Sequence, residues 1–186
     1  MAELENALAN TPKQGNVAGA ITARIQKHVV SPDNFRTVGG RYKISSKAQE
    51  NEAWGNAYKK LEELLSRKLK MRLYILVGLP CSGKSTWAEE GTVTTDRHPV
   101  IFDATNLTSV DRYRFIHSLS RFTDLPKVCV YFDTDMEIIR ERNRTLRTAG
   151  KQMTDDDLTL LHAKLEKPDP YEETWIDELI VVRSSG

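Results

Sequence analysis

The chain has 186 residues, of which 39% are hydrophobic, and this suits one α/β domain with a substantial core. Its 27 lysines and arginines almost balance its 26 aspartates and glutamates, so a net charge of +1 argues against a polybasic nucleic-acid binder of the histone type. The longest apolar run is far shorter than a membrane span, and Cys81 and Cys129 form neither a CxxC pair nor a metal-ligand cluster, so we expect a cytoplasmic protein with free thiols and no membrane partner.

Residues 1–27 are expected to form an N-terminal helical extension. A short helix is predicted for 2–10, and an amphipathic helix for 16–27, where apolar residues recur at every fourth position. The apolar run HVVS at 28–31 predicts a strand, which Pro32 ends because proline cannot continue the hydrogen-bond ladder.

A long helix is predicted for residues 47–69, after a turn marked by Gly39-Gly40. Its charged residues fall mostly on the side opposite to the apolar residues. Trp54 and Tyr58 lie beside the apolar face; aromatic rings of this kind can stack on bases, but their helical spacing favours packing. The residues that we expect to face the core are Ala53, Ala57, Leu61, Leu64, Leu65 and Leu69.

The rest of the chain alternates strands with helices. Thr154 and the three aspartates after it are typical of a helix start, because the hydroxyl caps the backbone and the acids favour the helix dipole. The alternation predicts an α/β fold, with a five-stranded parallel sheet and helices on both faces. Further strands are expected at 72–77, 100–103, 127–132 and 178–182, and helices from Lys84 onward and at 111–122, 136–146 and 155–165.

A phosphate-binding motif follows the strand at 72–77. The segment GLPCSGKS satisfies the pattern GxxxxGK[ST], between an apolar strand and a predicted helix, and an accidental glycine-rich turn does not explain this context. In such a loop Lys84 reaches the β- and γ-phosphates of an NTP, and the Ser85 hydroxyl binds Mg²⁺. The residues predicted to bind the nucleotide are Gly78, Cys81, Ser82, Gly83, Lys84, Ser85 and Thr86.

The segment RERNRTLRTAGK at 140–151 is strongly basic. On charge alone, an exposed basic helix face explains it better, but the upstream phosphate loop favours a lid whose arginines contact phosphates. Its cationic residues are Arg140, Arg142, Arg144, Arg147 and Lys151, against the single acid Glu141.

Four segments together resemble the polynucleotide 5′-kinase family of P-loop kinases: VGLPCSGKSTWA, VIFDATN, RNRTLR and LEKPDPYEETW. The resemblance implies a P-loop kinase fold, ATP or another NTP as donor, Mg²⁺, and a nucleic-acid 5′ end as acceptor. It also implies that Arg142, with Arg144 or Arg147, contacts the donor phosphates; the longer spacing here leaves both of the latter as candidates. Gln152-Met153 and Glu173-Thr174 depart from the family pattern.

The family places an S-x-D-x-x-R motif between the phosphate loop and DATN, where its aspartate is the general base and its arginine holds the acceptor. Here that interval holds only TTDR, whose spacing is wrong, whereas SPDNFR lies upstream at 31–36. The resemblance therefore assigns Asp33 as base and Arg36 as acceptor-binding residue. Without the resemblance, Asp33 is interpreted as an aspartate that bonds to the backbone of a turn, and Arg36 as a solvent-exposed side chain.

This order predicts permuted connectivity, in which two neighbouring βα units have changed places. The acceptor unit at 28–70 precedes the phosphate-loop unit at 71–91, and 99–186 completes a single kinase domain over 28–186. The family's sheet order would place the strand at 28–31 beside DATN. Both new connections can remain right-handed strand–helix–strand units.

Two residues near DATN complete the candidate site. Asp103 ends a strand beside the phosphate loop, where it can orient Mg²⁺-bound water or the acceptor, and Asn106 either supports Asp103 or starts a turn. Two other functions stay open: a kinase of a nucleoside, nucleotide or other small metabolite, and an NTP-binding switch or scaffold without transfer activity. The sequence does not fix the oligomeric state.

Overall fold

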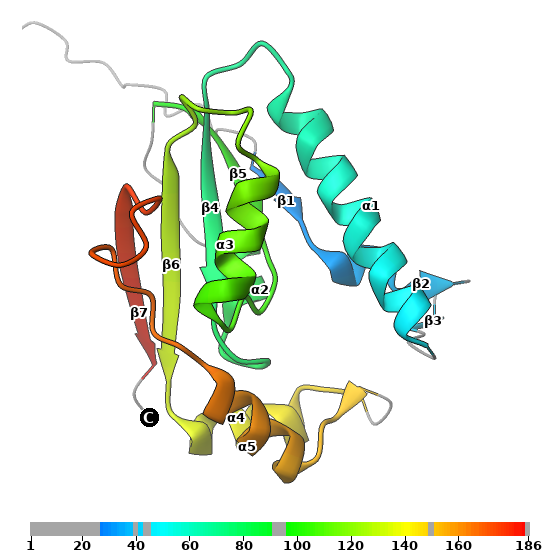
Figure 1. Ribbon diagram of the computed structural model, residues 1–186. Helices are drawn as coiled ribbons and strands as arrows, with labels where there is room; N and C mark the ends of the chain where they lie inside the picture. The colour runs from blue at the N-terminus through cyan, green and yellow to red at the C-terminus, as the bar shows by residue number, and fades with distance from the viewer. Residues whose placement is uncertain (1–26, 39–40, 43–45, 91–95, 149–150, 185–186) are drawn as a thin grey trace, which may run out of the picture.

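The computed structural model describes residues 27–38, 41–42, 46–90, 96–148 and 151–184 (Figure 1). The helices predicted for 2–10 and 16–27, and the turn at Gly39-Gly40, lie outside these residues, apart from Lys27. No helix in the described part is long and apolar enough to span a bilayer.

Five parallel strands form the central sheet. They are β1 (His28–Val30), β4 (Met71–Val77), β5 (His98–Phe102), β6 (Lys127–Thr134) and β7 (Glu178–Ser184). Their order is β1-β5-β4-β6-β7, so that Val30 pairs with Phe102 at one edge and β7 lies at the other. The strand at 28–31 thus lies beside the DATN strand, as the sequence predicts. A separate two-stranded antiparallel pair joins β2 (Thr37–Val38) and β3 (Arg41–Tyr42).

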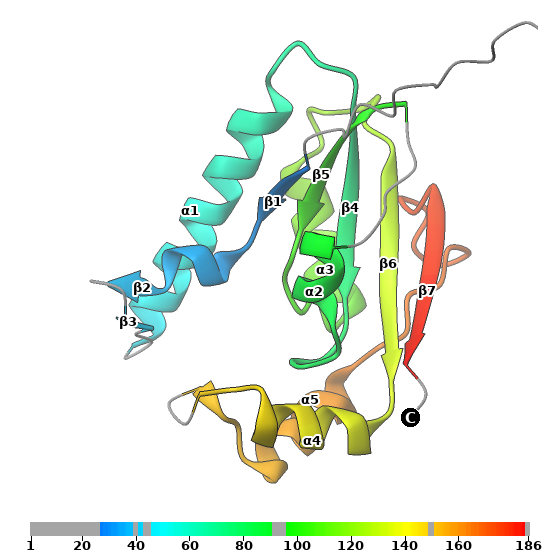
Figure 2. The ribbon, with the colours of Figure 1, turned by 180° about the vertical axis from the view of Figure 1, so that it is seen from behind.

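Helices cover both faces of the sheet, as Figures 1 and 2 show from opposite sides. One face is covered by α1 (Lys47–Leu65) and α3 (Ser109–Ser118), whose side chains enclose a core that includes Leu61, Leu73, Val100, Phe102 and Phe115. Trp54 and Tyr58 pack against this core, which confirms the packing interpretation of these aromatics. The opposite face is covered by α2 (Lys84–Glu90), where Trp87 and Ala88 meet Tyr74, Leu76 and Phe132.

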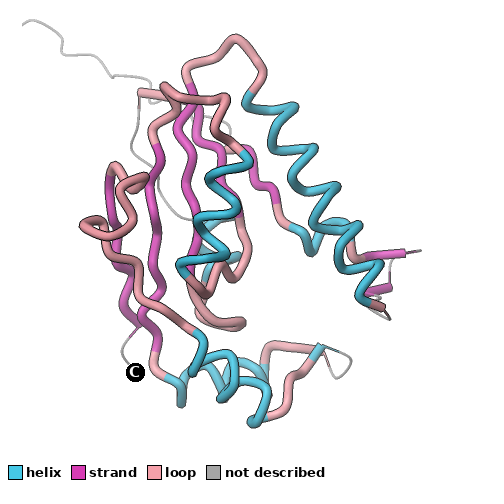
Figure 3. Tube along the Cα trace, viewed as in Figure 1, coloured by secondary structure: helices cyan, strands magenta, loops and turns pink. Residues whose placement is uncertain are grey.

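The last two helices lie beyond the carboxyl ends of the strands (Figure 3). They are α4 (Met136–Thr145) and α5 (Asp155–Lys164). The Thr154 hydroxyl accepts a hydrogen bond from Asp157 N at 3.1 Å, which confirms the predicted N-cap. Since ligands bind at the carboxyl edge of open α/β sheets, these helices lie where a lid is expected.

Most predicted elements begin and end within two residues of the observed ones, but α1 is shorter than predicted. It ends at Leu65 because the Ser66 N–H and hydroxyl both bond to Glu62 O, at 3.0 and 2.7 Å. Leu69, predicted to face the core, therefore lies past the helix and is 45% exposed. The other large difference concerns α3, which was predicted for 111–122. It begins two residues earlier because Thr108 caps it, and it already ends at Ser118.

Candidate active site

The phosphate loop connects β4 to α2 in a conformation that its residues make possible. Gly83 has a φ of +101°, and Cys81 has a φ of +65°, which is uncommon for a residue other than glycine. A Cβ on Gly78, whose φ is +154°, would lie 3.0 Å from both Phe132 Cβ and Ser82 Oγ, so the loop has room only for glycine there. The short η1 (Pro32–Phe35) lies across from this loop, after β1.

Lys84 is buried inside the loop. Its Nζ donates hydrogen bonds to Gly78 O at 2.9 Å and Leu79 O at 2.6 Å. Burial lowers the pKa of Lys84 from 10.5 to about 8, although Asp103, Cys81 and Asp33 oppose this shift. Additional negative charge in the loop would therefore favour the protonated form.

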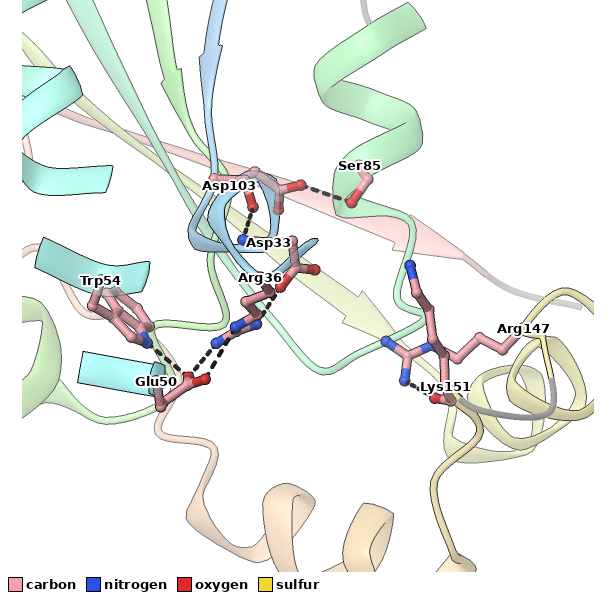
Figure 4. A network of polar contacts seen from close by, with 9 residues as sticks. Asp33, Arg36, Glu50, Trp54, Ser85, Asp103, Arg147 and Lys151 are labelled. Atoms are coloured by element: carbon pink, nitrogen blue, oxygen red, sulfur yellow. Dashed lines mark hydrogen bonds and ion pairs between the residues drawn. The ribbon is translucent and has the colours of Figure 1, made fainter. Parts of the chain in front are cut away.

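Ser85 and Asp103 meet at the carboxyl ends of β4 and β5. The Ser85 hydroxyl donates to Asp103 Oδ2 at 2.7 Å (Figure 4). Burial raises the pKa of Asp103, while the bond from Ser85 and the charge of Lys84 lower it. Asp103 N donates to Val30 O at 2.9 Å, so the end of β1 also holds the backbone that carries this carboxylate.

A cavity of about 1030 Å³ unites most of the predicted site residues. The phosphate loop, η1 and the lid segment after α4 surround it, although they are far apart in the sequence. The predicted residues that line it are Asp33, Arg36, Cys81, Ser82, Gly83, Lys84, Ser85, Thr86, Asp103, Arg142 and Arg147. Gly78 shapes the loop from behind and does not line the cavity.

Two further predicted residues, Asn106 and Arg144, do not line the cavity. Asn106 is buried with φ of +47°, and its Nδ2 donates to Leu76 O at 2.8 Å. It therefore fastens the segment after β5 to β4, and it makes no hydrogen bond to Asp103 in the described part of the chain. Arg144 is exposed, and its carbonyl accepts a bond from Gln152 Nε2 at 2.9 Å. Of the two alternative lid arginines, Arg147 is the one that reaches the cavity.

The side of the cavity that faces the phosphate loop is formed by η1 and the first turns of α1. The Ser31 hydroxyl accepts a hydrogen bond from Asp33 N at 3.3 Å and so caps η1. The Asp33 carboxylate is 58% exposed and pairs with Arg36. The Arg36 guanidinium also pairs with Glu50 through both Nε and Nη2.

The side of the cavity that includes the predicted lid is formed by the end of α4 and the segment that follows. Arg142 Nη1 lies over the phosphate loop, 3.4 Å from Cys81 O, and Arg147 Nη1 donates to Lys151 O at 2.7 Å. Asn143 is buried and exchanges two hydrogen bonds with the Met153 backbone, at 2.8 and 3.0 Å. This exchange holds the two sides of the lid segment together.

Sequence reasoning missed two polar contacts. Glu50 lies in the first turn of a predicted helix, four residues before Trp54, and this spacing was its only local sign of a hydrogen-bond partner. Arg112 is fully buried and pairs with Glu173 at 2.8 and 2.5 Å, and no local pattern marks a core arginine. Glu173 appeared in the sequence only as a departure from a family motif.

The site fits a nucleotide with Mg²⁺. The Ser82 hydroxyl lines the cavity, is buried, and has no hydrogen-bond partner among the described residues. Within those residues no cluster of three or more His, Cys, Asp or Glu side chains exists that would enclose a metal. One hydroxyl and one carboxylate match the way Mg²⁺ binds, since it relies on few protein oxygens together with phosphates and water.

Comparisons with known proteins found similarity to parts of this chain. A family model described as an AAA domain matches residues 91–168. The chain has a P-loop kinase-like fold and the features of a nucleotide-binding protein. No curated protein matches it at a significant level.

Two solved structures resemble parts of this P-loop kinase-like chain. Kti12 from Chaetomium thermophilum, in complex with ADP-AlF3, is 18% identical, with a TM-score of 0.48 over 60% of this chain and 89% of that chain. A sugar kinase from Janibacter sp. HTCC2649 is also 18% identical, with a TM-score of 0.42 over 61% of this chain and 85% of that chain.

Proposed function

We propose that the chain is a Mg²⁺-dependent kinase that transfers the γ-phosphoryl group of ATP, or of another NTP, to a hydroxyl acceptor. The acceptor that its motifs favour is the 5′-hydroxyl of DNA or RNA. The single observation that carries this proposal is the cavity in which the phosphate loop faces Asp33, with Arg142 and Arg147 beside both.

The donor half of the cavity supplies positive charge and hydrogen-bond donors. Lys84 lies within the loop, and Arg142 lies above it, so both can stabilise the charge on the migrating phosphoryl group. Ser85 and Asp103 would hold Mg²⁺, which neutralises phosphate charge when bound. The buried Ser82 hydroxyl is a further donor toward the phosphates.

The acceptor half supplies a base. Asp33 Oδ1 pairs with Arg36, and within the described part of the chain Oδ2 accepts no hydrogen bond. Asp33 Oδ2 accepts the acceptor's proton as the acceptor oxygen bonds to the γ-phosphorus. The bond from the γ-phosphorus to the β–γ bridging oxygen breaks, and the nucleoside diphosphate leaves.

The sheet order supports the interchange of two βα units. The strand before Asp33, β1, lies beside β5, and β5 lies beside the phosphate-loop strand β4. This is the neighbour relation that the interchange requires, although β1 precedes β4 in the chain. The AAA-domain match begins at residue 91, after the phosphate loop, and covers the part that we propose to retain the family's order.

One observation favours a second candidate, a kinase of a nucleoside or another small hydroxyl compound. The resemblance assigns Arg36 to an acceptor phosphate, but its guanidinium is already paired with Asp33 and Glu50. Two carboxylates outweigh one arginine, so this side of the cavity attracts a phosphate less than the family role implies.

The test is transfer from [γ-³²P]ATP with Mg²⁺ to 5′-hydroxyl DNA and RNA oligonucleotides and to a panel of nucleosides. We expect labelled oligonucleotide, and a loss of about 100-fold or more in Asp33→Asn, since a general base contributes roughly 10²–10⁴. Asn34→Ala is the matched control, because Asn34 is exposed on the same short helix and does not line the cavity. Label on nucleosides alone would select the second candidate, and label on no acceptor would select the NTP-binding scaffold.

A further inference from the structure

A chain of polar contacts runs from α1 to Asp33. Trp54 Nε1 donates to Glu50 Oε1 at 3.0 Å, and Glu50 accepts from Arg36 Nε at 3.1 Å through its other oxygen. Arg36 Nη2 bonds to Glu50 Oε1, and Arg36 Nη1 bonds to Asp33 Oδ1. Figure 4 shows the four side chains in this sequence, with the second Asp33 oxygen directed away from Arg36.

Glu50 determines the direction of the Arg36 guanidinium. An arginine side chain presents its five N–H donors in a planar fork, so a carboxylate on the Nε and Nη2 edge fixes the plane of the whole group. The remaining Nη1 is then directed to one oxygen of Asp33. Only 16% of the Arg36 side chain is exposed, so the guanidinium is held among these partners and does not extend into solvent.

Glu50 is itself held by a rigid element. It lies in the first turn of α1, a helix anchored in the core by Ala53, Ala57 and Leu61. The Trp54 indole, which packs against Phe102 and Tyr58, fixes the Glu50 carboxylate from the same helix face. The core of the sheet thus supports the four-residue helix η1, which has little core of its own.

We propose that Glu50 is a positioning residue for phosphoryl transfer: acting through Arg36, it keeps Asp33 Oδ2 directed to the incoming hydroxyl. This rests on the proposed kinase function. Without Glu50, the Nε and Nη2 edge of Arg36 would lose this carboxylate, and the guanidinium could turn to engage both oxygens of Asp33 in a bidentate pair. The base would then lose the oxygen that takes the proton, while the donor site would stay intact.

The experiment compares Glu50→Ala and Glu50→Gln with the wild-type chain in the transfer assay. We expect kcat to fall about 10- to 100-fold in Glu50→Ala, as for a misplaced catalytic group, with the KM for ATP unchanged. Glu50→Gln keeps an oxygen that can accept a hydrogen bond from Trp54 or Arg36. Its kcat is expected to lie between those of the wild-type chain and Glu50→Ala. Glu52→Gln, exposed on the same helix, is the matched control and keeps wild-type kcat.

A double-variant comparison separates positioning from a general loss of structure. If Glu50 acts through Asp33, then Glu50→Ala adds nothing to the defect of Asp33→Asn. Wild-type kcat in Glu50→Ala, or effects that multiply in the double variant, would overturn the proposal.

NMR gives a readout that does not need turnover. The Arg36 Nε–H and Trp54 Nε1–H signals are expected to shift in Glu50→Ala, while the indole signals of Trp87 and Trp175 stay in place. Unchanged Arg36 and Trp54 signals would overturn the proposal even in an active enzyme. If no acceptor is ever phosphorylated, the proposed function and the positioning role fail together, whereas inactive Glu50 variants of an active kinase support both.

Discussion

Two buried charged residues dominate the site at the scale of single residues. Lys84 and Asp103 are 7% and 8% exposed. Burial lowers the pKa of Lys84 and raises the pKa of Asp103, and both shifts favour the neutral form. Each charge partly supports the other, since Asp103 raises the pKa of Lys84 and Lys84 lowers that of Asp103. Groups balanced in this way respond strongly to a ligand that brings its own charges.

The pKa of about 8 for Lys84 predicts that ATP affinity falls as the pH rises. Phosphates favour the protonated amine, so below pH 8 the charge is already present and affinity is flat. Above pH 8 binding must take up a proton, which weakens it by up to about tenfold per pH unit. Calorimetry at pH 7, 8 and 9 in several buffers measures both the affinity and the proton uptake.

Two variants serve as controls for this pH dependence. Lys84→Arg keeps its charge throughout this range and is expected to lose the dependence. Cys81→Ser removes the only other ionisable side chain of the loop and should keep it. An affinity for ATP that stays flat to pH 9.5 in the wild-type chain would refute the argument.

Asp103→Asn is expected to stabilise the fold while it impairs turnover. The folded-state pKa of Asp103 is raised, so its ionised form destabilises the fold at neutral pH, and stability falls as the pH rises through that pKa. An amide still accepts the Ser85 hydrogen bond without the buried charge. We expect Tm to rise by about 2–4 °C for each kcal/mol gained, and kcat with Mg²⁺ to fall about 100-fold. A lower Tm by calorimetry would contradict this reading.

At the scale of elements, local rules predicted the helices and strands well because each rule depends on neighbours in the chain. The cap at Thr154 and the apolar periodicity of α1 are of this kind. The predicted end of α1 was wrong because the leucine spacing continues to Leu69, whereas the helix ends before Ser66. The contacts of Glu50 and Arg112 were missed because their partners lie 14 and 61 residues away.

The buried pair of Arg112 and Glu173 predicts a large loss of stability when it is broken. Arg112 on α3 bonds Glu173 and also donates to the carbonyls of Asn106, Leu107 and Glu166, at 3.0, 3.0 and 3.1 Å. Arg112→Ala leaves the Glu173 charge unpaired in the core, which costs roughly 3–5 kcal/mol. The free energy of unfolding in urea measures the loss.

The double variant Arg112→Met with Glu173→Leu tests the cause. With both charges removed, we expect part of the loss to be recovered, because no unpaired charge remains. Recovery is incomplete since three carbonyls have lost a donor. A double variant as unstable as Arg112→Ala would show that the carbonyl contacts, rather than the ion pair, hold this region.

At the scale of the whole molecule, the family resemblance predicted that SPDNFR and the phosphate loop would line one cavity, and both do. The strand before Asp33 was expected beside DATN because the family's sheet order places it there, and β1 does lie beside β5 although the two are far apart in the chain. Motifs specify which residue types the chemistry needs, so Asp33, Lys84 and Asp103 could be named from sequence. The orientation of Arg36 could not, since it depends on how α1 packs against η1.

If strand adjacency rather than chain order determines this fold, then moving residues 71–95 ahead of 28–70 should leave it intact. Two of the new joints are short in space. His98 N bonds to Lys70 O at 2.8 Å, so residues 70 and 96 can be connected directly. Lys27 Nζ bonds to Glu89 O at 2.9 Å, which places the start of β1 near the end of α2. Each new connection remains a strand–helix–parallel strand unit that can keep the right-handed sense.

The rearranged chain is expected to unfold cooperatively, with a Tm within about 10 °C of the original, since core and site contacts are conserved and only connections change. Its ATP affinity and kcat should stay within about tenfold, because every residue of the cavity keeps its neighbours. A chain with 71–95 placed after 96–186 is the control: it keeps the joint between 70 and 96, but it attaches β4 to the end of β7, an edge strand with which β4 does not pair, and it is expected to be less stable. A rearranged chain that folds but binds no ATP would mean that the observed order shapes the site itself.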